Sequence, residues 1–203
     1  MFLFILRFVN KDSADQRALN AYLKKPLSNE EIGTAYERYI GHLYEMKGYD
    51  VVYNGAVNGF ADFGRDLIVK TADEIFIIQT KCWAKYKQIK EKEIFQLFDS
   101  MTHFRLTSNR LGPPIKAVFY TSASYSDEAK EAAQVLGVEL RNEKLIQTYP
   151  MIKCNVSMNG SKYYHLPFDP YYDKVKINQG EECYVHTVAE AVAKGFRRAG
   201  TRL

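Results

Sequence analysis

The chain has 203 residues and a formal net charge of +4, with 46% hydrophobic and 26% charged residues. This is the composition of a soluble globular protein, and the mildly basic balance permits a polyanionic partner without requiring one. The three cysteines, an odd and sparse set, exclude a disulfide framework and fit a reducing cytosol, so we expect a cytoplasmic protein with free thiols.

The apolar start of the chain, MFLFILRF, is too short to span a bilayer, because a spanning helix needs about 20 residues. It also lacks the basic start and the cleavage site of a signal peptide. We expect an edge strand or an ordered tail. The alternative is the stub of a membrane segment lost from a longer form, and only in that case do we expect membrane association.

Residues 10–30 form a polar lead-in that Pro26 interrupts. A helix is predicted to begin after Ser28, because its side chain can cap the helix and acidic residues follow near the positive end of the helix dipole. Apolar and aromatic residues recur at helical spacing up to about Lys47, and Gly48 ends the helix.

Predicted strands and helices then follow one another. The strands are residues 49–55, the two arms of a hairpin at 66–69 and 75–82, a buried strand at 115–122 and a short strand at 138–140. The helices are residues 93–104 and 126–136. The resulting order, α-β-β-β-α-β-α-β, predicts an α/β fold in which helices cover both faces of a mixed sheet.

The amino-acid composition of the sequence changes near residue 149. Residues 149–203 are rich in tyrosine and lysine, with an irregular loop, LPFDPYYD, and a predicted terminal helix at about 187–198. We therefore divide the chain into a lead-in at 1–27, a main domain at 28–148 and a small α+β module at 149–203.

The predicted hairpin carries polar side chains that a core hairpin does not need. Asp66 opens its first strand, and Gln79 and Lys81 share one face of the second strand, because strand side chains alternate. If the turn is centred between Ala72 and Asp73, Asp66 lies opposite Gln79. The three polar side chains then meet at the open end of the hairpin.

A carboxylate, an amide oxygen and the Thr80 carbonyl are the kinds of oxygen that bind Mg²⁺ in proteins. A lysine beside such a site can orient the attacking water and stabilise the charge that grows on a phosphate. Together these groups indicate metal-assisted hydrolysis of a phosphodiester. The alternative is structural: Lys81 extends its charge to solvent from a strand end, and Asp66 caps a turn.

Asp66, Gln79 and Lys81 resemble the motif of the PD-(D/E)xK nuclease superfamily, specifically the Mrr-like restriction endonucleases that carry Gln-x-Lys in place of Glu-x-Lys. The Mrr-like pattern also has a glutamate on the helix before the sheet. Glu37 fits that place, and an exposed solubilising glutamate is the alternative for it. The resemblance covers about residues 28–147, and it departs from the superfamily pattern in having arginine rather than proline before Asp66.

The resemblance implies a restriction-endonuclease-like αβββαβ core and a metal-dependent DNA endonuclease of the restriction, defence or DNA-processing type. It implies catalytic roles for Asp66, Gln79, Lys81 and Glu37, and a Mg²⁺ or Mn²⁺ site formed by Asp66, Gln79, Thr80 and Glu37. DNA is the expected partner, with no small-molecule cofactor and with homodimer formation left open. The alternative is a catalytically inactive nuclease fold that binds DNA, because Gln79 replaces a carboxylate.

The stretch after the hairpin, KCWAKYKQIKEK, interleaves lysines with aromatic residues. Cations bind backbone phosphates and aromatic rings stack on bases, so beside a nuclease site we expect this stretch to contact DNA. The alternative is a solvated lysine-rich surface. The residues predicted to bind DNA are Trp83, Lys85, Lys87, Lys90 and, at the start of the next helix, Gln96.

The C-terminal module resembles a small domain often appended to bacterial nucleases, through the stretches IKCN, YYHLPFDPYYD and AVAKGFRRA. That resemblance implies no enzymatic role, and the basic, aromatic end of the module indicates that it helps to hold DNA. Cys154, His165, Cys183 and His186 do not have a usual zinc spacing. We expect buried thiols and hydrogen-bonded imidazoles there, with zinc as the alternative.

Overall fold

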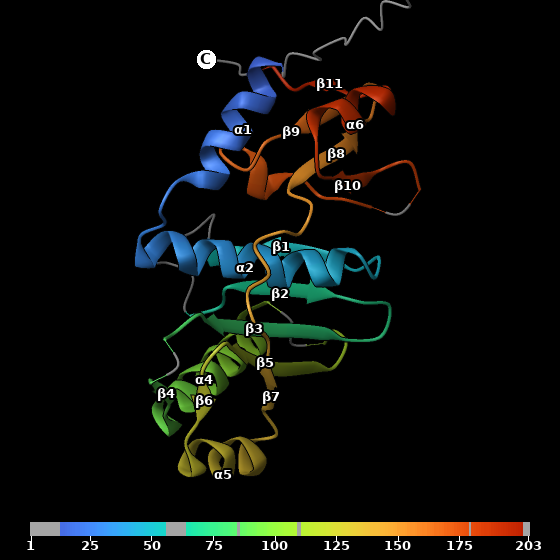
Figure 1. Cartoon of the computed structure of the whole chain (residues 1–203). Coiled ribbons are helices and arrows are strands. Elements are labelled where there is room, and N and C mark those ends of the chain that lie inside the picture. The colour runs from blue at the N-terminus through green and yellow to red at the C-terminus, as the bar shows by residue number, and fades with distance from the viewer. Residues whose placement is uncertain (1–12, 56–63, 85, 109–110, 179, 201–203) are drawn as a thin grey trace, which may run out of the picture.

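The computed structural model of the chain describes residues 13–55, 64–84, 86–108, 111–178 and 180–200 (Figure 1). The apolar start of the chain lies outside the described residues, as does Lys85 of the predicted DNA-binding stretch. Among the helices that the structure describes, none is long and apolar enough to cross a membrane.

A five-stranded mixed sheet forms the centre of the main domain, with the strand order β1-β2-β3-β5-β7. Neighbouring strands are antiparallel from β1 to β3 and parallel from β3 to β7. The strands are β1 (Asp50–Tyr53), β2 (Leu67–Lys70), β3 (Ile75–Lys81), β5 (Ile115–Thr121) and β7 (Glu139–Asn142). The predicted mixed α/β fold and its αβββαβ order are confirmed.

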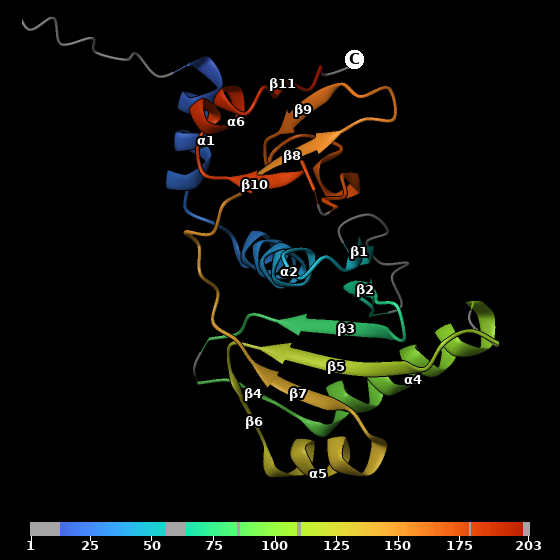
Figure 2. The same cartoon turned by 90° about the vertical axis from the view of Figure 1, so that its right-hand side faces the viewer.

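Helices cover both faces of this sheet, α2 (Asn29–Glu45) on one face and α4 (Glu91–Ser108) with α5 (Asp127–Leu136) on the other (Figure 2). Local sequence sets their ends. Ser28 and Glu31 form a reciprocal capping box at the start of α2, which satisfies two backbone groups that a helix start leaves unpaired. Each face has its own hydrophobic cluster, so the sheet is buried on both sides.

The hairpin has the predicted register. Leu67 pairs with Ile78 across β2 and β3, which places Asp66 opposite Gln79 one step further along. Along β3 the side chains alternate between the two clusters: Ile78 packs on the α2 side and Ile77 on the side of α4 and α5. Gln79 therefore belongs to the α4 side of the sheet.

The C-terminal module is a separate four-stranded sheet with the order β10-β8-β9-β11. Its elements are β8 (Ile152–Val156), β9 (Lys162–His165), the 3₁₀ helix η2 (Tyr172–Lys174), β10 (Cys183–Val185), α6 (Val188–Ala193) and β11 (Arg197–Arg198). The predicted terminal helix up to about residue 198 is wrong at its end. Gly195, at φ 84°, turns the chain after α6, and the next residues pair with β9 in parallel as β11.

The polar lead-in contains a helix, α1 (Ala14–Lys24), which Ser13 caps. Leu19 of α1 is buried in the hydrophobic cluster of the C-terminal module, and the Tyr164 hydroxyl donates a hydrogen bond of 2.6 Å to Asp15. The first described helix thus packs against the last part of the chain (Figure 1). The division of the chain into three segments stays a prediction, and this contact adds α1 to the core of the third segment.

Two glycines of α2 offer a matched test of how tightly this helix packs. A β-carbon at Gly41 would overlap the buried ring of Tyr53, whereas a β-carbon at Gly33 would meet no described atom within 4 Å. Alanine in place of a helical glycine gains about 1 kcal/mol of helix propensity, and overpacking a core costs about 1–3 kcal/mol. We expect Gly33→Ala to raise the free energy of unfolding by about 0.5–1 kcal/mol and Gly41→Ala to lower it, as measured by urea denaturation. An equal gain for both variants would contradict the close contact.

Candidate active site

Asp66 stands where the antiparallel ladder between β2 and β3 ends. Its main-chain amide donates to the Ile78 carbonyl at 3.0 Å, and its own carbonyl accepts from the amides of Asn54 and Gly55 at 2.8 and 3.0 Å. Its carboxylate Oδ2 accepts from the Thr80 amide at 2.6 Å and from the Thr80 hydroxyl at 3.1 Å. The backbone and the carboxylate of this buried residue are therefore held from three sides.

The Thr80 carbonyl faces the same open edge of β3 as the Asp66 carboxylate. In a strand, the N–H and C=O of one residue point to the same side. The Thr80 amide points toward Asp66, because it donates to the Asp66 carboxylate. The backbone oxygen that the sequence singled out thus lies on the Asp66 side of β3.

Gln79 brings an unsatisfied oxygen to this end of the sheet. Its side chain is 2% exposed, and its Oε1 has no hydrogen-bond partner among the residues that the structure describes. A β-carbon on Gly64, which has a φ of 73°, would lie 3.5 Å from Gln79 Nε2 and 3.4 Å from Gln96 Nε2. The two amides therefore flank Gly64, Gln96 approaching from α4, and the predicted contact of Gln96 with DNA stays a prediction.

Glu37 approaches the site from α2. A β-carbon on Gly55 would lie 3.0 Å from Glu37 Oε2 and 3.5 Å from Asp66 Cα. The partly buried glutamate thus points to the segment that holds Asp66, rather than standing on an outer face of the helix. Its place beside Asp66 agrees with the resemblance, and its function stays a prediction.

Lys81 ends β3 and links it to β5. Its carbonyl accepts from the Thr121 hydroxyl at 2.7 Å and from the Ser122 amide at 3.3 Å, so its backbone is fixed at the end of the parallel pair. Because side chains alternate along a strand, its side chain leaves the same face as that of Gln79. The predicted lysine and amide therefore share the α4 side of the sheet end.

These donors fit a hard divalent cation. The Asp66 carboxylate, the Gln79 oxygen, the Thr80 carbonyl and the Glu37 carboxylate are the oxygen ligands that Mg²⁺ and Mn²⁺ prefer. A buried amide oxygen without a partner costs about 1–3 kcal/mol, which a cation ligand would offset. Groups of three or more histidine, cysteine or acidic residues suited to a metal are absent from the described part of the chain.

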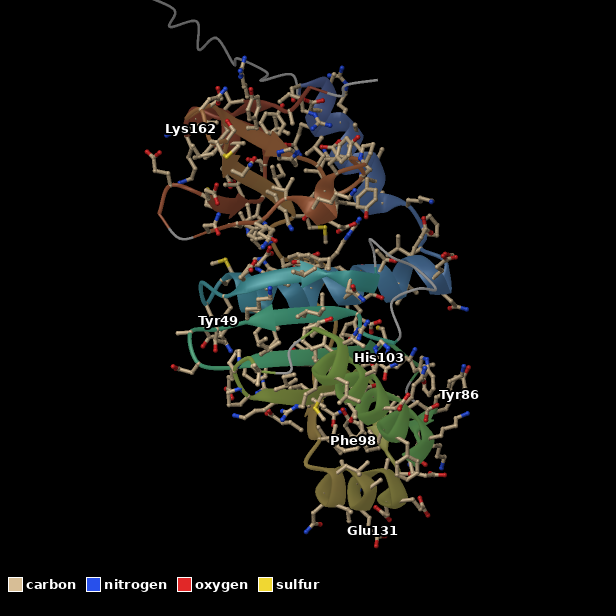
Figure 3. The ribbon with its side chains drawn as sticks, turned by 180° about the vertical axis from the view of Figure 1, so that it is seen from behind. Tyr49, Tyr86, Phe98, His103, Glu131 and Lys162 are labelled. Carbon is tan, nitrogen blue, oxygen red and sulfur yellow. The ribbon has the colours of Figure 1, made fainter. Side chains whose placement is uncertain are left out.

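The predicted DNA-binding stretch leaves the sheet directly after Lys81. Lys87 lies over the Trp83 ring at 5.5 Å, and Tyr86 is 85% exposed (Figure 3). Lys87 and Lys90 are exposed as well, whereas Trp83 is partly buried against the α4 side of the core. Aromatic and cationic groups are thus accessible beside the site, and their contact with DNA stays a prediction.

In the C-terminal module, Cys154 and Cys183 pair directly across β8 and β10. Burial raises the pKa of the Cys154 thiol to about 12, and the described residues contain no group of three or more histidine, cysteine or acidic side chains placed to hold a metal. His165 Nε2 shares a hydrogen bond of 2.9 Å with Asn155. This geometry favours the structural interpretation of Cys154 and His165 over zinc.

One supporting residue was not singled out from the sequence. The Asn54 side-chain amide donates to the Arg65 carbonyl at 2.8 Å, while its main-chain amide donates to the Asp66 carbonyl. Asn54 thereby holds the backbone just before and at Asp66. In the sequence, the Asn54-Gly55 pair indicates only a turn, because such pairs are common in turns.

Comparisons with known proteins identify the family of the main domain. A family described as restriction endonucleases, represented by the Mrr catalytic domain, matches residues 29–148, more than half of the chain. No curated protein sequence matches the chain significantly.

Two solved structures are similar in fold. One is EndoMS in a complex with double-stranded DNA, with 14% identity, a TM-score of 0.44, and coverage of 61% of this chain and 48% of that chain. The other is a repair endonuclease from Pyrococcus abyssi, with 13% identity, a TM-score of 0.42, and coverage of 60% and 50%. The chain spans about half the length of each. The family match therefore carries the assignment, and the chain belongs to the Mrr-type restriction endonuclease family.

Proposed function

We propose that this protein is a Mg²⁺- or Mn²⁺-dependent endonuclease that hydrolyses phosphodiester bonds in DNA. The observation that carries the proposal is the buried Gln79 oxygen, which has no partner among the described residues, on the residue opposite Asp66, whose carboxylate Thr80 holds, within the segment that the family model matches. A buried oxygen without a partner requires an explanation, and a bound cation is the one that agrees with the carboxylates nearby.

In this proposal, Asp66, Gln79, the Thr80 carbonyl and Glu37 hold the cation. A divalent cation at this position supplies positive charge next to the scissile phosphate. Lys81 orients the attacking water and stabilises the negative charge that develops on the phosphate oxygens. The hydrogen bonds from Thr80 keep the Asp66 carboxylate in one position, so little reorganisation accompanies the reaction.

DNA is the proposed substrate. The stretch from Trp83 to Lys90 offers the exposed cations of Lys87 and Lys90 for phosphates and the exposed ring of Tyr86 for a base, directly after the strand that ends in Lys81. The biological setting that fits these properties is restriction or defence against foreign DNA, or DNA processing.

A second candidate is a nuclease fold that binds DNA without cutting it. The observation that favours it is Gln79 itself, because an amide in place of a carboxylate leaves the site with one negative charge fewer and weakens its hold on a cation. A titration with Mn²⁺ separates the two candidates, because only the enzyme requires the cation at this site.

The first test is digestion of linear duplex, supercoiled, single-stranded and methylated DNA with Mg²⁺, with Mn²⁺ and with excess chelator. We expect internal cleavage of at least one form with either cation and none with chelator. Asp66→Asn should abolish cleavage while leaving DNA binding in place. Full-rate cleavage in excess chelator would contradict the metal dependence, and a lack of cleavage of every form would favour the second candidate.

Lys81→Met tests whether the lysine acts in the transition state. Methionine preserves the length and apolar character of the stem, so we expect unchanged thermal melting and DNA affinity within a few-fold. Single-turnover cleavage should fall about 10²–10³-fold, as for the loss of one preorganised group that stabilises developing charge. Lys81→Arg should also be slow, because a broad guanidinium does not replace a compact ammonium.

The control is Lys70→Met, because Lys70 is exposed at the opposite end of the hairpin. We expect this variant to cleave at the parent rate. Near-parent cleavage by a folded Lys81→Met variant would rule out a catalytic role for Lys81.

The salt dependence of binding tests the DNA-binding stretch. If Lys87 and Lys90 contact phosphates, alanine at both positions should reduce the slope of log affinity against log salt by about 0.9 for each lost contact on duplex DNA. Lys70→Ala is the matched control and should leave the slope unchanged. An unchanged slope in the Lys87/Lys90 variant would identify the stretch as a solvated surface.

A further inference from the structure

Helix α2 is packed on two opposite sides. Figure 2 shows it as a layer between the central sheet and the C-terminal module. Tyr36 and Ile40 face the sheet cluster. Arg38 and Glu45, seven residues or about two helical turns apart, lie on one stripe and contact the module.

Arg38 makes the first contact with the module. Its Nε and a terminal nitrogen donate to the two Asp173 carboxylate oxygens at 2.7 and 2.6 Å, and its other terminal nitrogen donates to the Pro167 carbonyl at 2.9 Å. Both side chains are mostly buried, at 15% and 16% exposure. A bidentate pair with a third bond defines one position of the helix relative to the module.

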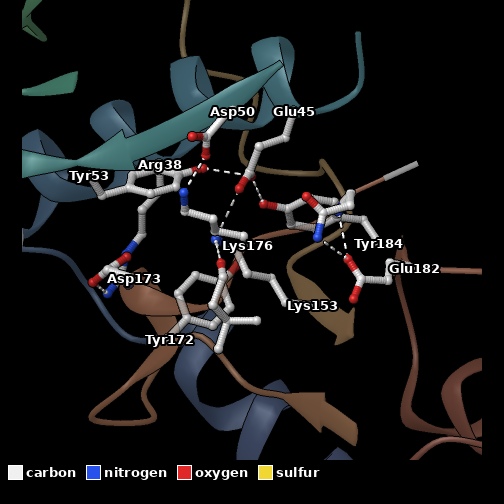
Figure 4. A network of polar contacts seen from close by, with 12 residues as sticks. Arg38, Glu45, Asp50, Tyr53, Lys153, Tyr172, Asp173, Lys176, Glu182 and Tyr184 are labelled. Carbon is white, nitrogen blue, oxygen red and sulfur yellow. Dashed lines mark hydrogen bonds and ion pairs between the residues drawn. The ribbon is translucent and has the colours of Figure 1, made fainter. Parts of the chain in front are cut away.

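Glu45 makes the second contact, through a buried network (Figure 4). The ammonium of Lys153, a residue that is 1% exposed, lies 3.5 Å from Glu45 Oε1 and donates to the Val175 carbonyl at 2.8 Å. The hydroxyls of Tyr53 and Tyr184 both donate to Glu45 Oε2. This end of α2 is thus bonded to β1 and to two strands of the module.

Glu37 is the residue before Arg38, about 100° around the helix, and it points to the segment that holds Asp66. Because a helix moves as a rigid body, the contacts of Arg38 and Glu45 also set how far the Glu37 carboxylate reaches toward Asp66. A displacement of about 1 Å at such a site is enough to lower its activity markedly.

We propose that the C-terminal module positions Glu37 at the cation site by holding α2 from the side opposite the sheet, with Arg38 and Asp173 as positioning residues. This inference rests on the proposed function of the site around Asp66. It assigns the module a role in the geometry of the site, in addition to any contact with DNA.

The test measures Mn²⁺ affinity without DNA, from the electron paramagnetic resonance signal of free Mn²⁺. It compares the parent, Glu37→Gln, Arg38→Met and the double variant. Glu37→Gln removes a proposed ligand and should weaken Mn²⁺ binding, and Arg38→Met should weaken it by about tenfold, the low end of the range for residues that orient metal ligands. The double variant should bind no more weakly than Glu37→Gln alone, because Arg38 acts only through Glu37.

Two further variants separate positioning from general stability. Asp173→Asn removes the carboxylate that pairs with Arg38 and should weaken Mn²⁺ binding as Arg38→Met does. It provides the same test if Arg38→Met folds poorly. Lys176→Met removes an ion pair of 2.5 Å between the module and Asp50 of β1, and should leave Mn²⁺ affinity unchanged. Thermal melting of each variant reports whether it is folded.

The outcomes distinguish the two proposals. If the parent binds Mn²⁺ and the folded Arg38→Met and Asp173→Asn variants bind it equally well, the positioning role alone is overturned. The same holds if Arg38→Met weakens binding equally with and without Glu37. A parent that binds no Mn²⁺ would overturn the cation site of the proposed function, and the positioning role with it.

Discussion

The site depends on the hydrogen bonds of Asp66, whose side chain takes the place of the backbone acceptor that a longer strand β2 would offer to β3. The Asp66 amide makes the last backbone bond of the ladder, to Ile78, and the Asp66 carboxylate then accepts from the next inward-facing amide, that of Thr80, at 2.6 Å. A buried amide left without a partner costs about 1–3 kcal/mol, so the end of the sheet itself favours a carboxylate there. The same bond that completes β3 therefore also orients the acidic group of the site.

Much of this arrangement is local, and it could be predicted from the sequence. The short turn between β2 and β3, where the Thr71 amide donates to the Glu74 carbonyl at 3.0 Å, fixes the register of the hairpin, because turn type and loop length set the pairing of adjacent strands. That register alone places Asp66 opposite Gln79. The distances from Glu37 and Gln96 to the hairpin could not be predicted, because they depend on how α2 and α4 pack on opposite faces of the sheet.

The errors in the predicted fold have local causes as well. The sequence indicates only a polar lead-in where α1 forms, because the apolar pattern of that helix is weak, and the structure buries only Leu19 of its residues. The sequence predicts too long a terminal helix, because AEAVAKGFRRA is rich in helix formers, whereas the pairing of β11 with β9 is a tertiary contact that overrides local propensity. In both places the missing information is the packing partner, which lies far away in the chain.

The interface between α2 and the module buries charged groups, which costs free energy of desolvation. Burying Lys153 and Glu45 requires both charges to lose water, and apolar residues of similar volume often stabilise such a site as well or better. Burial lowers the pKa of Lys153, while Glu45 opposes that shift, so the cation and its partner depend on each other. The charged network adds hydrogen bonds, which are directional. Glu45 also accepts from Tyr53 and Tyr184, and Arg38 donates two hydrogen bonds to Asp173. An apolar contact could slide by a fraction of an ångström at little cost, whereas these bonds cannot. Because α2 carries Glu37 toward Asp66, bonds that prevent the helix from sliding also keep the Glu37 carboxylate at a constant distance from Asp66.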